Sequence, residues 1–440
     1  MDSVLLGYWS FPLLLALIFM GMPIALAMML IGLAGSIIIF GSVSPVLNQL
    51  NALAYSQFST HSLSIVPLFL LMGQLATVGG MSKALFKCAE TFLGHRKGGV
   101  AMAAIGAGAG FGAVCGSSLA TAATMGQVAL PELRRVGYDP ALATGTLAAG
   151  GTLGILIPPS IVLVIYAILA EQNVAVLFAA ALIPGILAAL GYMAVISIRV
   201  HINPKLASDF PRASWSERGK ALVDIWPVLT IFVVVIGGIY TGIFTPTEGA
   251  SVGVIITFIL AWSKGGIRRS NLKGIIVGTA SASAMVYFIV LGAGAFNTFL
   301  ALSQMPQELA GLLTSASLSP YLILTIILIF YLILGCVMDS LSMILLTIPI
   351  LFPIVSTLDF GLPAEEAAVW FGILVLIVVE VGLITPPVGM NLFIIHGMAP
   401  DIPIQKTFRG VIPFVASDLV RVVILVAFPV ITLWLPRLLQ

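Results

Sequence analysis

Long apolar runs separated by short polar breaks dominate this chain. A run of about 20 apolar residues is the length that crosses a bilayer as a helix. The run from Leu5 to Phe40 exceeds that length, and Gly21-Met22-Pro23 divides it into two short spans. Further spans are expected at residues 62–78, 174–198, 222–244, 250–263, 275–302 and 411–434. The pattern therefore predicts a helical protein that crosses a membrane repeatedly.

Four other apolar stretches are interrupted by residues that an ordinary helix does not contain. Small residues interrupt one stretch at Cys115-Gly116-Ser117-Ser118, and the equivalent Val337 to Leu341 interrupts a second. Breaks that end in proline pairs interrupt the other two, at 150–159 and at Gly382–Pro387. Proline lacks a backbone N–H and moves the preceding residue out of helical geometry. In hydrocarbon, irregular chain is tolerated only beside protein or a polar cavity. We predict re-entrant helical hairpins at 98–131 and 320–357, and discontinuous transmembrane helices at 139–170 and 367–396.

The basic residues indicate which loops face the cytoplasm, because Lys and Arg are enriched on that side. Seventeen of the 19 basic residues fall in five places: Lys83 to Lys97, Arg134-Arg135, Arg199 to Lys220, Lys264 to Lys273, and Lys406 with Arg409. No Lys or Arg occurs from Ile275 to Gln405, and the Thr245–Gly249 turn also lacks them, so the breaks there are expected outside. The first hairpin then enters from the cytoplasm and the second from outside.

The two halves of the chain repeat each other. Cys115 to Leu119 aligns with Val337 to Leu341 at an offset of 222, and the sequence GILIPP at 154–159 aligns with GLITPP at 382–387 at an offset of 228. Paired broken helices in repeats of opposite topology indicate a transporter site near the membrane midplane. We predict an all-α polytopic membrane protein with an inverted-topology repeat. Its parts are a first repeat at 1–200, a cytoplasmic linker at 201–221 and a second repeat at 222–440.

Composition agrees with this class. Hydrophobic residues make up 60% of the chain and charged residues 8%, whereas soluble domains carry about 25% charged residues. The net charge of +2 gives no reason to expect nucleic-acid binding. The four histidines are scattered and the three cysteines lack metal-site spacing, so a membrane enzyme is not expected. A channel would need a filter and would not require inverted hairpins.

Broken helices also supply the chemistry of an ion and substrate site. They leave carbonyl oxygens without intrahelical partners, which suits Na⁺, and short helix N-termini favour a substrate carboxylate. Asp339 is predicted to serve the ion or substrate site, because intramembrane carboxylates are costly. Glu380 could serve that site or make a scaffold hydrogen bond. Asp418 and Arg421 have the i, i+3 spacing of an internal ion pair.

Six motifs resemble the large membrane subunit of tripartite ATP-independent periplasmic (TRAP) transporters, the DctM-like subunits of the ion-transporter superfamily. The resemblance covers essentially the whole chain. The motifs are GSSLATAATMG (116–126), LPELRRVGYDP (130–140), GGTLGILIPPSI (150–161), GIYTGIFTPTEGA (238–250), GCVMDSLSMILLTIPILFP (335–353) and VGLITPPVGMNLF (381–393).

The resemblance implies Na⁺-driven import of an organic anion, such as a C4-dicarboxylate or a sugar acid, across the bacterial inner membrane. An elevator-type scaffold and transport domain, a periplasmic substrate-binding protein and a small four-helix membrane subunit on a separate chain are implied with it. A stand-alone Na⁺-coupled dicarboxylate carrier of the same superfamily is the alternative. The implied sodium residues are Ser117, Ser118, Gly154, Pro158, Asp339, Ser340, Gly382 and Thr385. The candidates for substrate contacts are Ser117, Thr152, Thr385 and Asn391.

Overall fold

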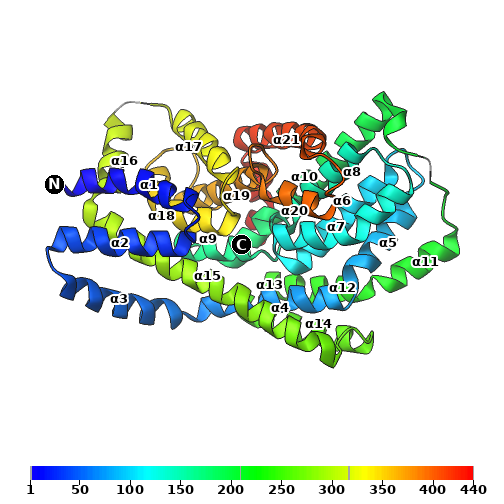
Figure 1. Ribbon diagram of the computed structural model, residues 1–440, viewed down its shortest axis with the longest axis horizontal. Coiled ribbons are helices and arrows are strands. Elements are labelled where there is room, and N and C mark those ends of the chain that lie inside the picture. The colour runs from blue at the N-terminus through cyan, green and yellow to red at the C-terminus, as the bar shows by residue number, and fades with distance from the viewer. Residues whose placement is uncertain (1, 209, 316–317, 440) are drawn as a thin grey trace.

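The computed structural model describes residues 2–208, 210–315 and 318–439, which form helices joined by short turns, without strands (Figure 1). The predicted all-α fold class is confirmed. The first half contains α1 (Ser3–Phe19), α2 (Ile24–Phe40), α3 (Val43–Phe58), a 3-10 turn (His61–Ser64), α4 (Ile65–Val78), α5 (Met81–Leu93), α6 (Gly99–Cys115), α7 (Ser118–Arg135), α8 (Pro140–Leu156), α9 (Ile161–Leu169) and α10 (Val174–Ile202).

The second half follows the same order of elements. It contains α11 (Trp215–Asp224), α12 (Trp226–Phe232), a π-helical turn (Val233–Gly237), α13 (Gly238–Tyr240), α14 (Pro246–Ser263), α15 (Arg269–Ser303), α16 (Met305–Ser315), α17 (Pro320–Gly335), α18 (Ser340–Ser356), α19 (Ala364–Gly382), α20 (Met390–Met398), α21 (Ile404–Ala427) and α22 (Val430–Leu439). The start of α18 lies 222 positions after that of α7 (340 − 118), and the start of α20 lies 229 after that of α9 (390 − 161). The helices α6 to α10 thus correspond in order to α17 to α21.

Three local predictions need correction. Two helices, α3 and α16, were not expected, because their polar residues interrupt the apolar pattern. The predicted Thr245–Gly249 turn is instead the start of α14: Thr245 Oγ1 accepts a hydrogen bond from Glu248 N, and the Glu248 carboxylate accepts one from Thr245 N. This reciprocal pair is a capping box, which the TPTE sequence permits. Residues 201–221, predicted as a linker, also include the end of α10 and most of α11.

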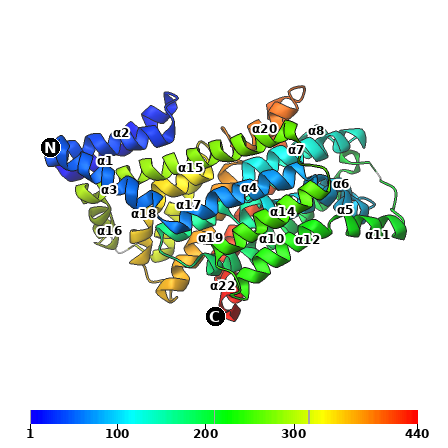
Figure 2. The same ribbon diagram turned by 90° about the horizontal axis from the view of Figure 1, so that it is seen from below.

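Long helices form a layer along one side of the molecule. In this layer α2 packs on α15 and α4 packs on α14, and the four run together across Figures 1 and 2. The hairpins and broken helices form the remaining body of the structure. Within it α7 packs on α20 and α18 packs on α9, so each hairpin contacts the broken helix of the other half.

Several helices have the length and composition of membrane spans. Among the described residues five qualify: His61–Val78, Val174–Ile202, Pro246–Ser263, Arg269–Ser303 and Ile404–Ala427. Two bent pairs raise the number to as many as seven, and one of them is α8 with α9, which meet at 46°. The hairpin arms α6, α17 and α18 are apolar but have 16 or 17 residues. At 1.5 Å per residue each is about 25 Å long, shorter than the hydrocarbon core.

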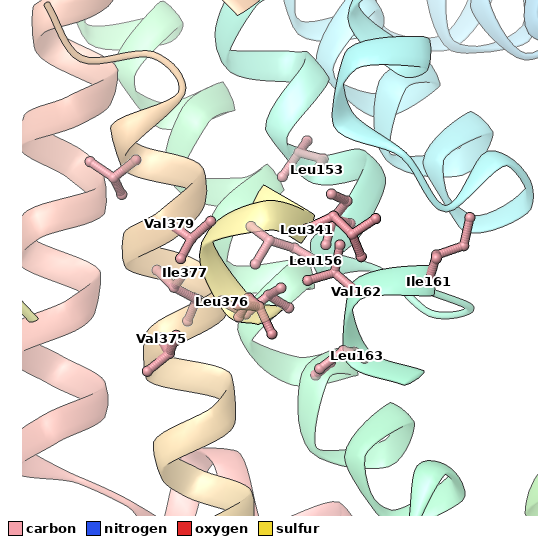
Figure 3. Close-up of a cluster of buried hydrophobic side chains, with 14 of the residues drawn as sticks. Leu153, Leu156, Ile161, Val162, Leu163, Leu341, Val375, Leu376, Ile377 and Val379 are labelled. Carbon is pink, nitrogen blue, oxygen red and sulfur yellow. The ribbon is translucent and has the colours of Figure 1, made fainter. Parts of the chain in front are cut away.

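The interior of the body is packed around α19. Every residue of this helix from Ala368 to Gly382 is buried, as expected for a helix that is apolar on all sides. Val375, Leu376 and Val379 lie in one cluster with Leu153 and Leu156 of α8, Ile161, Val162 and Leu163 of α9 and Leu341 of α18 (Figure 3). This enclosure fixes the position of the one acidic side chain near the end of α19, Glu380.

Candidate functional site at the hairpin tips

At the tip of the first hairpin, α6 ends and α7 begins within two residues. Gly116 ends α6 with a φ of +63°, a left-handed conformation that glycine adopts without strain. A Cβ at this position would also lie 3.0 Å from the carbonyl oxygen of Pro159. Ser117 then caps α7, and its hydroxyl accepts a hydrogen bond from Ala120 N at 3.4 Å. The tip is therefore held against the first proline break.

The tip of the second hairpin has the same design with a carboxylate as the cap. Asp339 precedes α18, and its Oδ2 accepts hydrogen bonds from Leu341 N at 3.1 Å and Ser342 N at 3.0 Å. The other oxygen, Oδ1, accepts a hydrogen bond from the Ser342 hydroxyl. Asp339 is half-buried and thus serves its own helix while it faces the space beside the tip. The two tips differ by one negative charge.

The two tips meet at Glu380. The Ser118 hydroxyl donates a hydrogen bond to Glu380 Oε2, and the Ser340 hydroxyl donates one to Oε1 at 2.7 Å. All three residues are buried, and Glu380 is only 1% exposed. Ser118 and Ser340 hold equivalent places as the first residues of α7 and α18. A single carboxylate therefore joins the two halves of the repeat through one hydrogen bond to each tip, behind the residues that line the neighbouring pocket.

A pocket of about 440 Å³ lies beside the paired tips. On one side it is lined by tip residues, among them Ser117, Ser118, Asp339 and Ser340, and on the other by α4 and α15 of the long-helix layer. Gln74 and Thr77 of α4 add polar groups to the wall. None of the described residues that line it is Lys, Arg or His, so its formal charges are negative. No group of three or more His, Cys, Asp or Glu able to hold a metal occurs in the described ranges.

Close backbone contact joins each hairpin to the helix that precedes a proline pair. A Cβ on Gly112 of α6 would lie 2.5 Å from Gly154 Cα, and a Cβ on Gly382 would lie 2.5 Å from Gly335 Cα. Gly154 and Gly382, both predicted as sodium residues, thus lie where a hairpin arm and a broken helix touch. Pro158 is buried just beyond Gly154, and the Pro158-Pro159 and Pro386-Pro387 bonds are both cis.

Three of the predicted substrate residues lie away from the pocket, and only Ser117 lines it. Thr385 is half-buried, and its hydroxyl donates a hydrogen bond to Val381 O at 2.6 Å. Asn391 is fully buried, and its Nδ2 donates one to Ala148 O of α8 at 3.3 Å. The remaining residue, Thr152, is also fully buried and belongs to a separate polar network.

That network ties the first broken helix to α10 and α21, the long helices that follow the two broken helices. The hydroxyls of Thr152 and Tyr192 lie 3.1 Å apart, and Tyr192 donates a hydrogen bond to Asp418 Oδ2 at 2.6 Å. Asp418 in turn forms an ion pair with Arg421 at 2.8 Å, which confirms the pair expected from the i, i+3 spacing. All four residues are buried. The network therefore holds α8, α10 and α21 in fixed relation just behind the proline break.

Paired hairpin tips, paired proline breaks and a pocket bounded by both tips and a layer of long apolar helices define a multi-pass membrane transporter. Comparison with known proteins agrees. Residues 11–431 match the family model described as the tripartite ATP-independent periplasmic transporter, DctM component. The chain belongs to this family, so the predicted resemblance is confirmed.

Two of the relatives are named as large permeases and are matched over nearly their full length. The C4-dicarboxylate TRAP transporter large permease protein DctM of Pseudomonas aeruginosa is 37% identical over 412 residues, which cover 92% of this chain and 93% of that protein. The sialic acid TRAP transporter large permease protein SiaM of Vibrio cholerae is 31% identical and matches 96% of this chain and 97% of its own. The crystal structure of the YdaH transporter of Alcanivorax borkumensis shares the fold, with a TM-score of 0.62, 15% identity and 98% coverage of both chains.

Proposed function

We propose that this protein imports an organic anion, coupled to Na⁺, across the bacterial inner membrane. The observation that carries the proposal is the Glu380 carboxylate shared by the two hairpin tips beside a pocket without basic side chains among its described lining residues. The names of the Pseudomonas and Vibrio relatives support a carboxylate, such as a C4-dicarboxylate or sialic acid, as the substrate.

The charges of the site support coupling to a cation. Asp339 already brings a negative charge to the pocket at the tips, so an anionic substrate entering the same pocket is repelled unless cations enter with it. Hydroxyl, carboxylate and backbone carbonyl oxygens at the tips and breaks suit Na⁺. The proposed sodium residues are Ser117, Ser118, Gly154, Pro158, Asp339, Ser340, Gly382 and Thr385, and Glu380 links the two tips that carry them.

The substrate carboxylate is proposed to bind at the first tip. The N-terminus of α7 begins at the pocket and has Ser117, a neutral residue, as its cap, so its partial positive charge remains available to an anion. The N-terminus of α18 is capped by the carboxylate of Asp339 and favours a cation instead. The cation would then bind at the second tip and the anion at the first. Each would partly neutralise the charge of the other.

The arrangement also supports an elevator mechanism. The pocket lies between the tips and helices α4 and α15, where a body that carries the site can slide along a fixed layer. Exposed carboxylates and unpaired backbone oxygens are costly in hydrocarbon, so the loaded site must be neutralised and closed before it crosses. We propose that α6–α10 and α17–α22 form the moving part.

Two partners are proposed because the family is described as tripartite. One is a small four-helix membrane subunit on a separate chain, and the other is a periplasmic substrate-binding protein. The purified chain alone in proteoliposomes is expected to take up little C4-dicarboxylate or sialic acid under an inward Na⁺ gradient. Uptake should appear when both partners, with substrate loaded on the binding protein, are added. Strong uptake of free substrate by the chain alone would instead support a stand-alone carrier.

A further inference from the structure

The short helix α11 has two unlike faces on the side of the protein that carries the basic loops. It begins with a Ser214–Glu217 capping box and packs on α5 through Arg218 and Ala221, its two buried residues. The rest of its surface exposes apolar side chains, with Trp215 79% exposed and Val223 67% exposed. A short helix with exposed Trp and aliphatic residues next to basic residues is typical of a membrane interface.

The buried face of α11 contains an unpaired cation. The Arg218 guanidinium carbon lies 4.9 Å from the ring centre of Trp215 and 5.6 Å from that of Phe92 in α5, so two aromatic rings contact it. The residue is 7% exposed, and its Nε and Nη2 atoms are buried without a hydrogen-bond partner in the described part of the chain. A buried charge without a partner is strongly unfavourable, so these donors call for an anionic ligand.

Other basic groups share this part of the surface with Arg218. Desolvation lowers the pKa of His95, and the nearby guanidinium groups of Arg212, Arg218 and Arg96 lower it further. Asp224 lies at the C-terminal end of α11, and two other acidic groups of α11 and α5 are already engaged. Glu217 accepts hydrogen bonds from the backbone and hydroxyl of Ser214 at 2.7 and 2.9 Å, and Glu90 pairs with Lys87 at 2.8 Å. The cluster of Arg218, Arg212, Arg96 and His95 therefore carries excess positive charge beside a face suited to lipid.

We infer that this cluster binds the phosphate of an anionic phospholipid headgroup. Arg218 supplies unpaired donors in the planar arrangement that pairs well with phosphate oxygens, while Arg212, Arg96 and His95 add attraction for the negative charge. The exposed Trp215 and Val223 side chains lie among the acyl chains and place the headgroup within reach. Because α5 leads directly into the first hairpin, the bound lipid fastens α11 to the segment that connects the long-helix layer to the site.

The test measures lipid binding to the purified full-length chain in detergent. Phosphatidylglycerol or phosphatidylcholine is added, thermal unfolding is followed, and retained lipid is counted by native mass spectrometry. Phosphatidylglycerol is expected to raise the melting temperature and remain bound, while phosphatidylcholine does neither. Arg218→Gln should weaken phosphatidylglycerol binding about tenfold or more, because a charge-assisted hydrogen-bond pair is lost. Without lipid, the same variant should be at least as stable as the wild type, since it removes an unpaired buried charge.

Lys220→Gln is the matched control, since Lys220 is exposed on the same helix and the charge change is equal. It should alter binding by less than about twofold, because an exposed charge contributes little. If Arg218→Gln fails to fold, Arg212→Gln, at an exposed position, should weaken binding several-fold. Equal binding of the two lipids, or equal losses in Arg218→Gln and Lys220→Gln, would overturn the inference. Equal stabilisation by millimolar inorganic phosphate without lipid would overturn the assignment to a lipid. None of these results depends on transport.

Discussion

Replacement of Glu380 by Gln lowers Na⁺-driven uptake about tenfold or more and raises the Na⁺ concentration needed for half-maximal uptake. The carboxylate accepts hydrogen bonds from Ser118 and Ser340 with its two oxygens. An amide has one oxygen, so one serine loses its acceptor and the link between the two tips is weakened. A lost hydrogen bond to a charged group is worth about 1.5–3 kcal/mol, which corresponds to at least a tenfold change in rate.

Uptake into proteoliposomes with both partners present measures this effect over a range of Na⁺ concentrations. Glu90→Gln is the matched control, because Glu90 is also a buried glutamate but pairs with Lys87 on α5, away from the tips. It should leave the Na⁺ dependence unchanged. If Glu380→Gln behaves like Glu90→Gln, the carboxylate has a packing role and the two tips are not coupled through it.

Gly112→Ala is expected to abolish most transport and to destabilise the chain. The added Cβ would lie 2.5 Å from Gly154 Cα, a backbone atom just before the first proline break, so the hairpin arm and the broken helix must separate. Overpacking of this kind costs about 1–3 kcal/mol. Because the first tip is attached to the displaced arm, Ser118 should lose its contact with Glu380 as well. Uptake and thermal unfolding of the purified protein measure the two effects.

Gly106→Ala tests whether the effect comes from the contact and not from the loss of a glycine. Gly106 lies on the same helix, but its added Cβ would meet the mobile end of Met193, Cε, at 3.2 Å. Both substitutions gain the same helix propensity, of about 1 kcal/mol, so their difference isolates the backbone contact. Transport by Gly106→Ala should stay near the wild-type level. A Gly112→Ala protein that transports equally well would show that this close approach is not needed.

Periodicity and local chemistry explain why most of the framework could be predicted from the sequence. Gly116-Ser117 and Pro158-Pro159 stop or break a helix through their own backbone properties, so helices end at both tips and beside both proline pairs, as expected. The first break is shorter than expected, because residues 150–156 belong to α8. The helices α3 and α16 were missed because short helices with polar residues lack the apolar run on which the span predictions rest. Their structure depends on packing against neighbours, which a local pattern does not contain.

The site was harder to predict because its contacts join distant parts of the chain. Ser118 and Glu380 are 262 positions apart, and a pairing of that kind has no local signature. The sequence did contain one indication of this contact. Equivalent serines, Ser118 and Ser340, follow the two tips, and the Glu380 carboxylate lies just before the second break. Thr152 was predicted to contact substrate because its hydroxyl lies close to the first break. Its hydroxyl instead lies beside that of Tyr192, a distant partner that the local sequence does not reveal.

The central claim is that cations and substrate share a site at the two hairpin tips. The most direct test compares the Na⁺ dependence of uptake by the wild type and by Asp339→Asn. Asn caps a helix about as well as Asp, so α18 should remain intact while the negative charge at the second tip is lost. With both partners and saturating loaded binding protein, wild-type uptake should require Na⁺, and K⁺ should not replace it. Asp339→Asn should need more Na⁺ for half-maximal uptake and show a lower Hill coefficient for Na⁺. Wild-type uptake without Na⁺, or an unchanged Na⁺ dependence in Asp339→Asn, would contradict the account.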